Sequence, residues 1–413
     1  MEKPLMCLDL SDGSAKVLIG YNVGGEPVVA FSDEHNIDGA IKGGVVSDPE
    51  RLIEIVSSFH EVSDPSTKFS VSVSSGICLL LPPIGLKVYA LDQTTNVVSE
   101  TSEISKTDIT NLMSMASKFS LPDPHTAIVD IIPDEFILES GERYANPPLG
   151  KVSRRLGMKA KIFVMPESVL NAYKRVLNQA GMRPLRIGLT PYCQAELFKT
   201  YPNLPTSYLL VDIGAKLTSV SLIGDGSCYA STSFLLGGDD LTGEIAEAFQ
   251  IEFSYAENLK KDYGYDTREK KLNPPLLPGQ SELTQSELNQ IIEAHFERLD
   301  AMLHNAISTI LMSYGGKLNE LPIIFTGGGS SLYGISSLFA KTFRERALFF
   351  PEIRSIGARE RGFSPSLGMI LTASRYMGSL EDNLRGVTSL TRPRVEKEDT
   401  KTIRSSRPDI DNL

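Results

Sequence analysis

The stretch LLVDIGAKLTSVSLIGDG, residues 209–226, joins an apolar run that ends at Asp212 to a second apolar run and a glycine turn. Alternating apolar residues on both sides of a small-residue turn predict a β-hairpin. The stretch CLDLSDGSAKVLIGYNVGG, residues 7–25, repeats this order half a chain earlier, with Asp9 in the place of Asp212. The repetition predicts two related α/β lobes that face a common cleft.

The overall composition is that of a globular protein rather than a nucleic-acid binder. The chain has 413 residues, 41% of them hydrophobic and 22% charged, with a net charge of −10. This length is sufficient for two domains or one large two-lobed body. The negative charge argues against the basic face that a dedicated nucleic-acid binder needs.

Cysteine spacing and apolar segments indicate a cytosolic location. The four cysteines lie far apart without a Cys-x-x-Cys pair, which favours reduced thiols over disulfides or zinc. Asp9 and Asp12 interrupt the first apolar run, so no signal peptide is expected. The apolar stretch at 76–86 is too short to span a bilayer and contains two prolines.

The elements around the two hairpins predict how the chain is divided. Residues 126–144 are expected to form two strands on either side of Pro133, and residues 240–261 one long helical region. The predicted divisions are 1–82 and 159–205 (core of the first lobe), 83–158 (inserted subdomain), 206–237 and 322–378 (core of the second lobe), 238–321 (second-lobe subdomain) and 379–413 (disordered polar tail).

Two opposed hairpin turns can bind a polyphosphate between the lobes. Backbone N–H groups in such turns bind anions, and small residues allow close approach. Asp9 and Asp212, at the ends of their strands, are candidate ligands for hydrated Mg²⁺. The candidate phosphate contacts are Ser11, Gly13, Ser14, Lys16, Gly214 and Ala215.

A third glycine-rich segment, FTGGGSS at 325–331, follows a predicted buried strand and precedes a helix. Its bare backbone can lie against a flat base or a ribose, with helix N–H groups nearby. No Gly-Lys-Ser/Thr follows, so it is not a Walker A loop.

The order of these three segments resembles the actin-like ATPases, the superfamily of actin, Hsp70 and sugar kinases. Within it the chain is similar to the FtsA family of bacterial cell-division proteins over nearly residues 1–376. The similar segments are KGGVVSDPERL (42–52), IIPDEFILESGERYANPPLG (131–150), VLNQAGMRP (176–184) and FTGGGSSLYGISSLFAKTF (325–343). The segment at 235–264 is similar both to FtsA and to the pilus protein PilM.

The resemblance implies a two-lobed actin-like fold with RNase H-like lobes and an FtsA-type insert. It implies a protein that binds ATP with Mg²⁺, forms filaments and recruits the tubulin-like FtsZ through its C-terminal tail to the cytoplasmic face of the cell membrane. Other division proteins would bind the insert. By matching positions, Lys216, Gly237 and Gly238 join the phosphate contacts. The implied adenosine contacts are Glu257, Lys260, Gly327, Gly328, Gly329 and Ser330.

Three departures from the family pattern modify this expectation. The second turn usually reads Asp-[Ile/Leu]-Gly-Gly-Gly-Thr-[Thr/Ser]-Asp, whereas here Ser219 stands in place of the closing aspartate. Ser11 occupies a usual glycine position, and the tail at 391–413 has no apolar stripe of the kind that anchors a helix in a membrane. We therefore expect ATP binding with weak or no hydrolysis and no assigned catalytic residue. Attachment to the membrane is expected to be peripheral, either through a partner or through an anchor that is not visible in this sequence.

Two alternatives remain open. A PilM-like ATPase of type IV pilus assembly is favoured by the Asp-Ile-Gly-Ala turn, whereas the insert segment at 131–150 favours FtsA. A small-molecule kinase of the same superfamily would need a catalytic carboxylate and a substrate pocket in the first lobe, and no motif indicates either.

Overall fold

The first hairpin forms the centre of a five-stranded sheet in the first lobe. The computed structural model describes residues 4–37, 39–64, 69–72, 77–268, 276, 284–314 and 320–380. β1 (Leu5–Leu10), β2 (Ser14–Val23) and β3 (Glu26–Asn36) run antiparallel, and β8 (Ile77–Leu81) and β13 (Pro184–Leu189) add parallel strands in the order β13-β8-β1-β2-β3. Nearly every residue of β1 and β8 is buried, as expected for central strands.

The second hairpin is the centre of an equivalent sheet. β14 (Tyr208–Ile213), β15 (Leu217–Gly224) and β16 (Ser227–Leu235) run antiparallel, and β17 (Ile323–Thr326) and β18 (Leu348–Phe349) continue in parallel. The order β16-β15-β14-β17-β18 repeats the arrangement of the first lobe. The predicted two-lobed α/β fold is confirmed.

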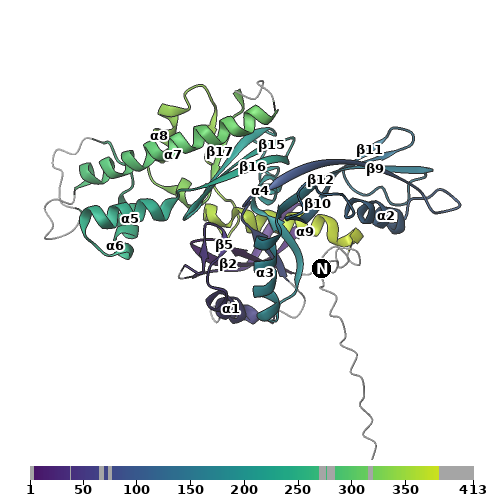
Figure 1. Ribbon diagram of the computed structural model, residues 1–413, viewed down its shortest axis with the longest axis horizontal. Coiled ribbons are helices and arrows are strands. Elements are labelled where there is room, and N and C mark those ends of the chain that lie inside the picture. The colour runs from purple at the N-terminus through teal and green to yellow at the C-terminus, as the bar shows by residue number, and fades with distance from the viewer. Residues whose placement is uncertain are drawn as a thin grey trace, which may run out of the picture.

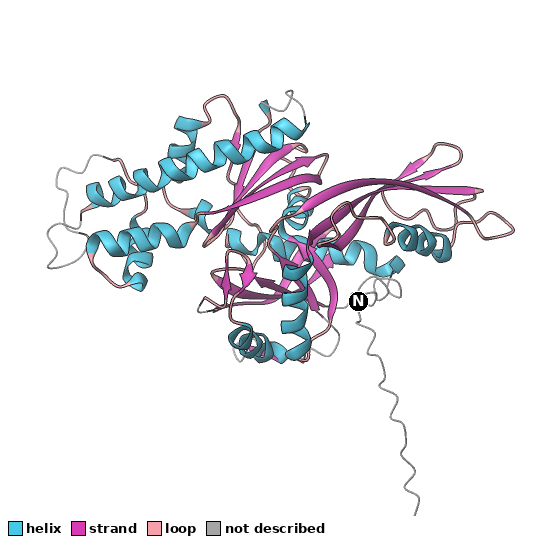
Figure 2. Cartoon of the chain, viewed as in Figure 1, coloured by secondary structure: helices cyan, strands magenta, loops and turns pink. Residues whose placement is uncertain are grey.

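Helices cover both sheets, and Figure 2 shows that they dominate the end formed by the second lobe. The helices are α1 (Pro49–Ser57), α3 (Glu167–Gln179), α4 (Thr190–Phe198), α5 (Gly238–Phe249), α6 (Phe253–Tyr263), α7 (Gln285–Tyr314), α8 (Ile335–Thr342) and α9 (Ser364–Leu380). The shorter strands are β4 (Ile41–Lys42), β5 (Val45–Val46), β6 (Glu61–Asp64) and β7 (Phe69–Ser72). None of the helices in the described part of the chain is both long and apolar enough to cross a membrane.

Helix α9 packs in the first lobe. Its sequence lies at the end of the segment expected in the second lobe, yet it packs on β1, β2, β3 and β8 of the first-lobe sheet and on α4. A Cβ atom at Gly368 would lie 1.8 Å from the carbonyl oxygen of Cys193, so only glycine permits this approach of α9 to α4. The first-lobe core therefore includes residues from both ends of the described chain.

The insert forms its own layer, at the opposite end of the molecule from α5 and α6 (Figure 1). Its antiparallel sheet has the order β11-β10-β12-β9, formed by β9 (Lys87–Asn96), β10 (Thr126–Leu138), β11 (Arg143–Tyr144) and β12 (Arg155–Pro166). Helix α2 (Lys106–Ala116) packs on it, with Ile109 and Leu112 in a separate apolar core.

Two local predictions were wrong. β10 runs through Pro133 as one strand, because a bulge between Pro133 and Glu135 shifts the pairing with β12 where proline lacks an N–H. The single helical region expected at 240–261 is two helices, since Gln250 adopts a left-handed conformation, φ 51°, at the end of α5.

Candidate functional site

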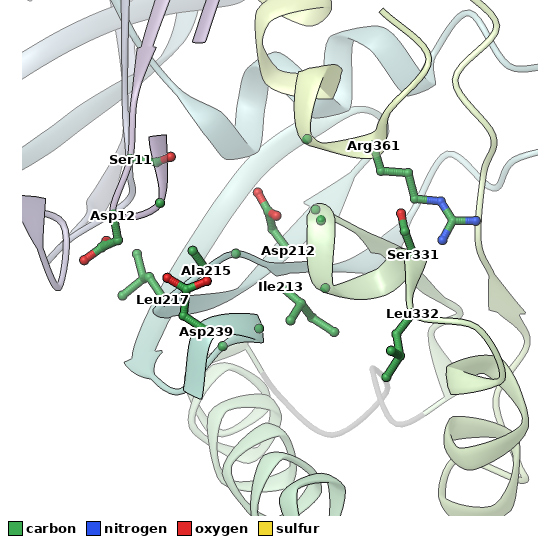
Figure 3. A pocket seen from close by; sticks show the side chains of 18 of the residues that line it. Ser11, Asp12, Asp212, Ile213, Ala215, Leu217, Asp239, Ser331, Leu332 and Arg361 are labelled. Atoms are coloured by element: carbon green, nitrogen blue, oxygen red, sulfur yellow. The ribbon is translucent and has the colours of Figure 1, made fainter. Parts of the chain in front are cut away.

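A cavity of about 570 Å³ lies between the two lobes, where both hairpin turns meet. Figure 3 shows Ser11 and Asp12 of the first turn beside Ala215, Leu217 and Asp239 of the second lobe. Most of the residues predicted from the sequence line this cavity. They are Asp9, Ser11, Gly13, Ser14, Lys16, Asp212, Gly214, Ala215, Gly237, Gly238, Glu257, Lys260, Gly327, Gly328 and Gly329.

The two turns approach each other so closely that their small residues are required. A Cβ atom at Gly13 would lie 2.7 Å from the Cβ of Ala215. The start of α5 packs against the second turn, because a Cβ at Gly237 would lie 2.4 Å from the carbonyl oxygen of Ala215. The backbone N–H groups of Gly238 and Asp239 donate to the carbonyl oxygens of Gly214 and Ala215, at 2.9 and 2.8 Å. Backbone hydrogen bonds and close packing thus join the second turn to the start of α5.

Two carboxylates lie at the strand ends behind the turns, Asp9 buried and Asp212 half-buried. Burial raises the pKa of Asp9 to about 6, and the nearby charge of Asp212 adds to this effect while Lys16 opposes it. Burial also raises the pKa of Asp212, whose Oδ2 accepts a hydrogen bond of 2.8 Å from the side-chain amide of Gln194 in α4. The cavity therefore contains negative charge that the protein only partly compensates.

Lys16 is held at the edge of the cavity by groups of the first lobe. Its Nζ lies 3.2 Å from Glu34 Oε1 and donates to Ser14 Oγ at 2.7 Å. Glu34 was not predicted, because it lies on β3 and belongs to no motif. The only sequence signal is its place opposite Lys16 in the antiparallel register, which requires the hairpin lengths to be known.

Glu257 and Lys260 of α6 form a half-buried ion pair rather than an exposed one. Lys260 Nζ lies 2.6 Å from Glu257 Oε2, and the Lys260 side chain is only 12% exposed. The same Nζ donates to the carbonyl oxygen of Gly238 at 2.9 Å and to Thr242 Oγ1 at 2.7 Å. The pair thereby joins α6 to the first turn of α5.

The three glycines at 327–329 have different roles. Gly327 has φ +81°, and a Cβ there would lie 2.2 Å from Asp212 Oδ1. A Cβ at Gly329 would lie 2.3 Å from Ile213 Cγ2, whereas Gly328 has no atom within 4 Å of that position. Two of the glycines are thus needed for packing against β14, and the third leaves open space.

Two predicted site residues do not line the cavity. Lys216 Nζ lies 3.1 Å from Oδ1 of Asp240, so its positive charge compensates this carboxylate in the first turn of α5. Ser330 is buried, and its Oγ donates to the carbonyl oxygen of Gly327 at 2.8 Å to close the glycine turn. The prediction that both residues face a nucleotide is therefore not supported by their placement.

One end of the cavity is apolar, and the sequence motifs did not predict it. Its lining comes from α7 and α8, whose apolar periodicity indicates only that these helices have a buried face. Leu241 of α5 adds to it. The remaining residues are Ile292, Phe296 and Leu299 of α7 and Ile335 and Leu338 of α8.

Comparisons with known proteins agree with this architecture. The family model described as "Cell division protein FtsA" matches residues 209–368, and the model described as "SHS2 domain inserted in FTSA" matches residues 86–164. The cell division protein FtsA of Streptococcus pneumoniae is 24% identical over 390 residues, which cover 91% of this chain and 80% of that protein. The FtsA of Bacillus subtilis is 25% identical over 383 residues, which cover 89% and 83%.

Among solved structures, a chain of the PilM-PilN type IV pilus biogenesis complex superimposes with a TM-score of 0.58 at 16% identity, over 90% of this chain and 99% of that chain. This likeness supports the actin-like fold alone. Both family models, by contrast, describe FtsA, and they match two different parts of the chain, the second lobe and the insert. The chain belongs to the FtsA family of cell-division proteins.

Proposed function

We propose that this protein binds ATP between its lobes, assembles with copies of itself into actin-like filaments and recruits FtsZ to the cytoplasmic face of the membrane in cell division. One observation supports the nucleotide site above all others. Turns from two duplicated lobes meet at Gly13 and Ala215 over a single cavity, in a chain of the FtsA family. The polyphosphate would lie at this meeting point, and the adenosine between α6 and the glycine turn at 327–329.

Asp9 and Asp212 fit a hydrated Mg²⁺. Their partly desolvated, incompletely compensated charges favour a divalent cation nearby, and Mg²⁺ prefers a few carboxylates together with water and phosphate oxygens. No group of three or more His, Cys, Asp or Glu side chains that could hold a metal occurs in the described residues, so the protein would supply only part of the ligand set. When bound, the ion would neutralise charge on the phosphates.

The protein side chains then bind and orient the nucleotide rather than cleave it quickly. Lys16 would supply a positive charge to the phosphates, and Gln194 holds the Asp212 carboxylate in place. Ser219, opposite Asp212 in the sheet, has a hydroxyl where the usual motif has a second carboxylate. Weak or absent hydrolysis follows from this exchange, because the hydroxyl is a poorer group for ordering Mg²⁺ or water.

Equilibrium titration with Mg²⁺-ATP tests the nucleotide site. Asp212→Ala should weaken binding of Mg²⁺-ATP by about tenfold or more, because the variant loses one of the two carboxylates proposed to hold the ion. The exposed Asp262 of α6 provides a matched control, and Asp262→Ala should leave affinity unchanged. An Asp212→Ala variant that binds ATP as tightly as the natural protein would refute the site.

Co-sedimentation with a peptide of the FtsZ C-terminal tail tests the partner. We expect binding, with the second-lobe subdomain at 238–321 as the receiving surface and the insert left for other division proteins. The polar tail predicted at 379–413 lies almost wholly outside the described residues. Failure to bind the FtsZ peptide, together with binding to a pilus partner's tail, would favour the PilM alternative. Transfer of phosphate from ATP to a small alcohol would favour a kinase.

A further inference from the structure

The insert touches the second lobe as well as the first, although the chain enters it from β8 and leaves it for β13 of the first-lobe sheet. β9 of the insert lies against β16, the outer strand of the second-lobe sheet (Figure 1). A cavity of about 640 Å³ remains where the insert and the two lobes meet. Because this junction contains open space, the polar contacts that cross it are specific connections between the insert and the second lobe.

One of these contacts comes from the bulge in β10. The pairing of β10 with β12 shifts between Pro133 and Glu135, so Asp134 is the extra residue of the bulge. A bulge changes the direction in which a side chain points. The Oδ2 atom of Asp134 accepts a hydrogen bond from Lys161 Nζ of β12 at 2.7 Å. Its Oδ1 atom accepts one from Ser227 Oγ of β16 at 2.8 Å, so the bulge residue joins the insert to the second lobe.

Lys161 supplies a second contact with the same strand. Its side chain is only 9% exposed, and its Nζ lies 4.1 Å from the centre of the Tyr229 ring of β16. A cation over an aromatic face is attracted to it, and more strongly where water is excluded. Tyr229 is itself fixed within the second lobe, because the hydroxyl of Tyr314 in α7 donates to its carbonyl oxygen at 2.6 Å. Both members of the ion pair in the insert therefore have a partner on β16.

These contacts lie beside a crossing of the chain from the first lobe to the second, between α4 and β14. The turn before Ser227 packs on this crossing. The N–H group of Gly226 donates to the carbonyl oxygen of Thr206 at 3.0 Å, and a Cβ at Gly226 would lie 2.1 Å from Lys199 Cε. From this turn β15 runs about 25 Å to the second cleft turn, at about 3.3 Å per residue. A small rotation of the second lobe at the crossing therefore displaces the turn that meets Gly13 by more.

We propose that the insert braces the second lobe, with Asp134 and Lys161 holding β16 in the arrangement in which the two cleft turns meet. In this arrangement a Cβ at Gly13 would lie 2.7 Å from the Cβ of Ala215, so the braced state has the turns in contact. A ligand held by both turns needs them close together, and loss of the brace lowers the population of that state. By linkage, such a ligand also strengthens the hold of the insert on β16.

The brace goes beyond the proposed function, which assigns the insert only to other division proteins. Its coupling to ATP rests on the proposed nucleotide site, whereas the contact with β16 does not. The brace is therefore tested first by a distance between the lobes and only then by nucleotide affinity.

Spin labels on the two lobes of the full chain measure their separation without nucleotide. All four natural cysteines are buried, so the labels attach to cysteines introduced by Glu50→Cys in α1 and Asp262→Cys in α6, both exposed positions of different lobes. Combining Ser227→Ala with Tyr229→Leu removes both partners of the insert from β16. This double variant should broaden the distribution of label distances towards longer values.

Two matched substitutions serve as controls. Ser227→Thr keeps the hydroxyl group that donates to Asp134, so it should retain the natural distance distribution. Ser231→Ala removes a serine of the same strand whose Oγ pairs with Ser221 Oγ inside the second lobe. It should also leave the distribution unchanged, because this hydrogen bond does not cross to the insert.

Affinity for Mg²⁺-ATP then measures the coupling. The double variant should bind about three- to tenfold more weakly than the natural protein, the effect of one net hydrogen bond, and both controls should bind equally to it. An unchanged distance distribution in the double variant would overturn the brace, whatever happens to affinity or to stability in urea. A broader distribution with unchanged affinity would overturn the coupling to the cleft. If the natural protein binds no ATP while the double variant still broadens, the nucleotide site is wrong and the brace stands.

Discussion

Replacing Asp9 with asparagine should stabilise the nucleotide-free protein above neutral pH. Asp9 lies at the end of β1, only 5% exposed, and shares the cavity with a second carboxylate, Asp212. Asparagine has nearly the same shape and no charge, so the substitution removes a buried charge without leaving a cavity.

The magnitude follows from the pKa of Asp9. Burial raises this pKa from 3.8 to about 6, so the folded protein binds the proton more tightly than the unfolded chain does. The contribution of the Asp9 carboxyl to the free energy of unfolding is therefore fully present below pH 4, and it is lost as the pH rises through about 6. A shift of about two units corresponds to about 3 kcal/mol at pH 8, since each unit is about 1.4 kcal/mol. The attraction between Asp9 and Lys16, lost in the variant, makes this an upper figure.

Urea unfolding at pH 4 and pH 8, without nucleotide or Mg²⁺, measures the effect. We expect Asp9→Asn to unfold at higher urea concentration than the natural protein at pH 8, and nearly together with it at pH 4. Adding Mg²⁺ and ATP should reverse the order at pH 8, because the variant lacks one proposed ligand of the ion. The exposed Asp262→Asn should change neither comparison.

An Asp9→Asn variant that is less stable than the natural protein by the same amount at both pH values would refute this reasoning. Such a result would mean that the carboxylate serves as a structural hydrogen-bond acceptor, whose loss does not depend on its charge. The proposal that Asp9 is kept for a cation would then lose its energetic argument.

Three further substitutions test other parts of the molecule. Gly13→Ala should weaken ATP binding, because its new methyl group meets Ala215 at 2.7 Å, and Ala215→Gly in the same chain should restore affinity in a calorimetric titration. Lys16→Ala should lower ATP affinity by about tenfold or more in the same assay, and an unchanged affinity would place the phosphates elsewhere. Asp130→Ala should reduce the free energy of unfolding by about 3–5 kcal/mol, because it removes a buried carboxylate that pairs with Arg186 and accepts a hydrogen bond from Tyr192; urea denaturation with unchanged stability would contradict this.

The sequence by itself determined the local elements on which the site is built. The hairpins around Asp9 and Asp212 and the glycine turn at 327–329 depend on alternation and turn chemistry, which act over a few residues. Repetition of one hairpin pattern was enough to predict two lobes, because each copy has the same apolar strands to bury. The site residues on the two turns were therefore predictable from the sequence pattern. The family resemblance added the two site residues on α6, Glu257 and Lys260.

Only the tertiary structure decided which of these residues meet and which turn away. The contact of Gly13 with Ala215, the bond from Gln194 to Asp212 and the path of α9 across the first lobe join segments far apart in the chain. Lys216 was predicted to face phosphate, but the register of α5 gives it Asp240 as a closer partner. Such pairings depend on how whole sheets and helices pack, which no local pattern specifies. For the same reason the apolar end of the cavity became visible only once α7 and α8 were in place.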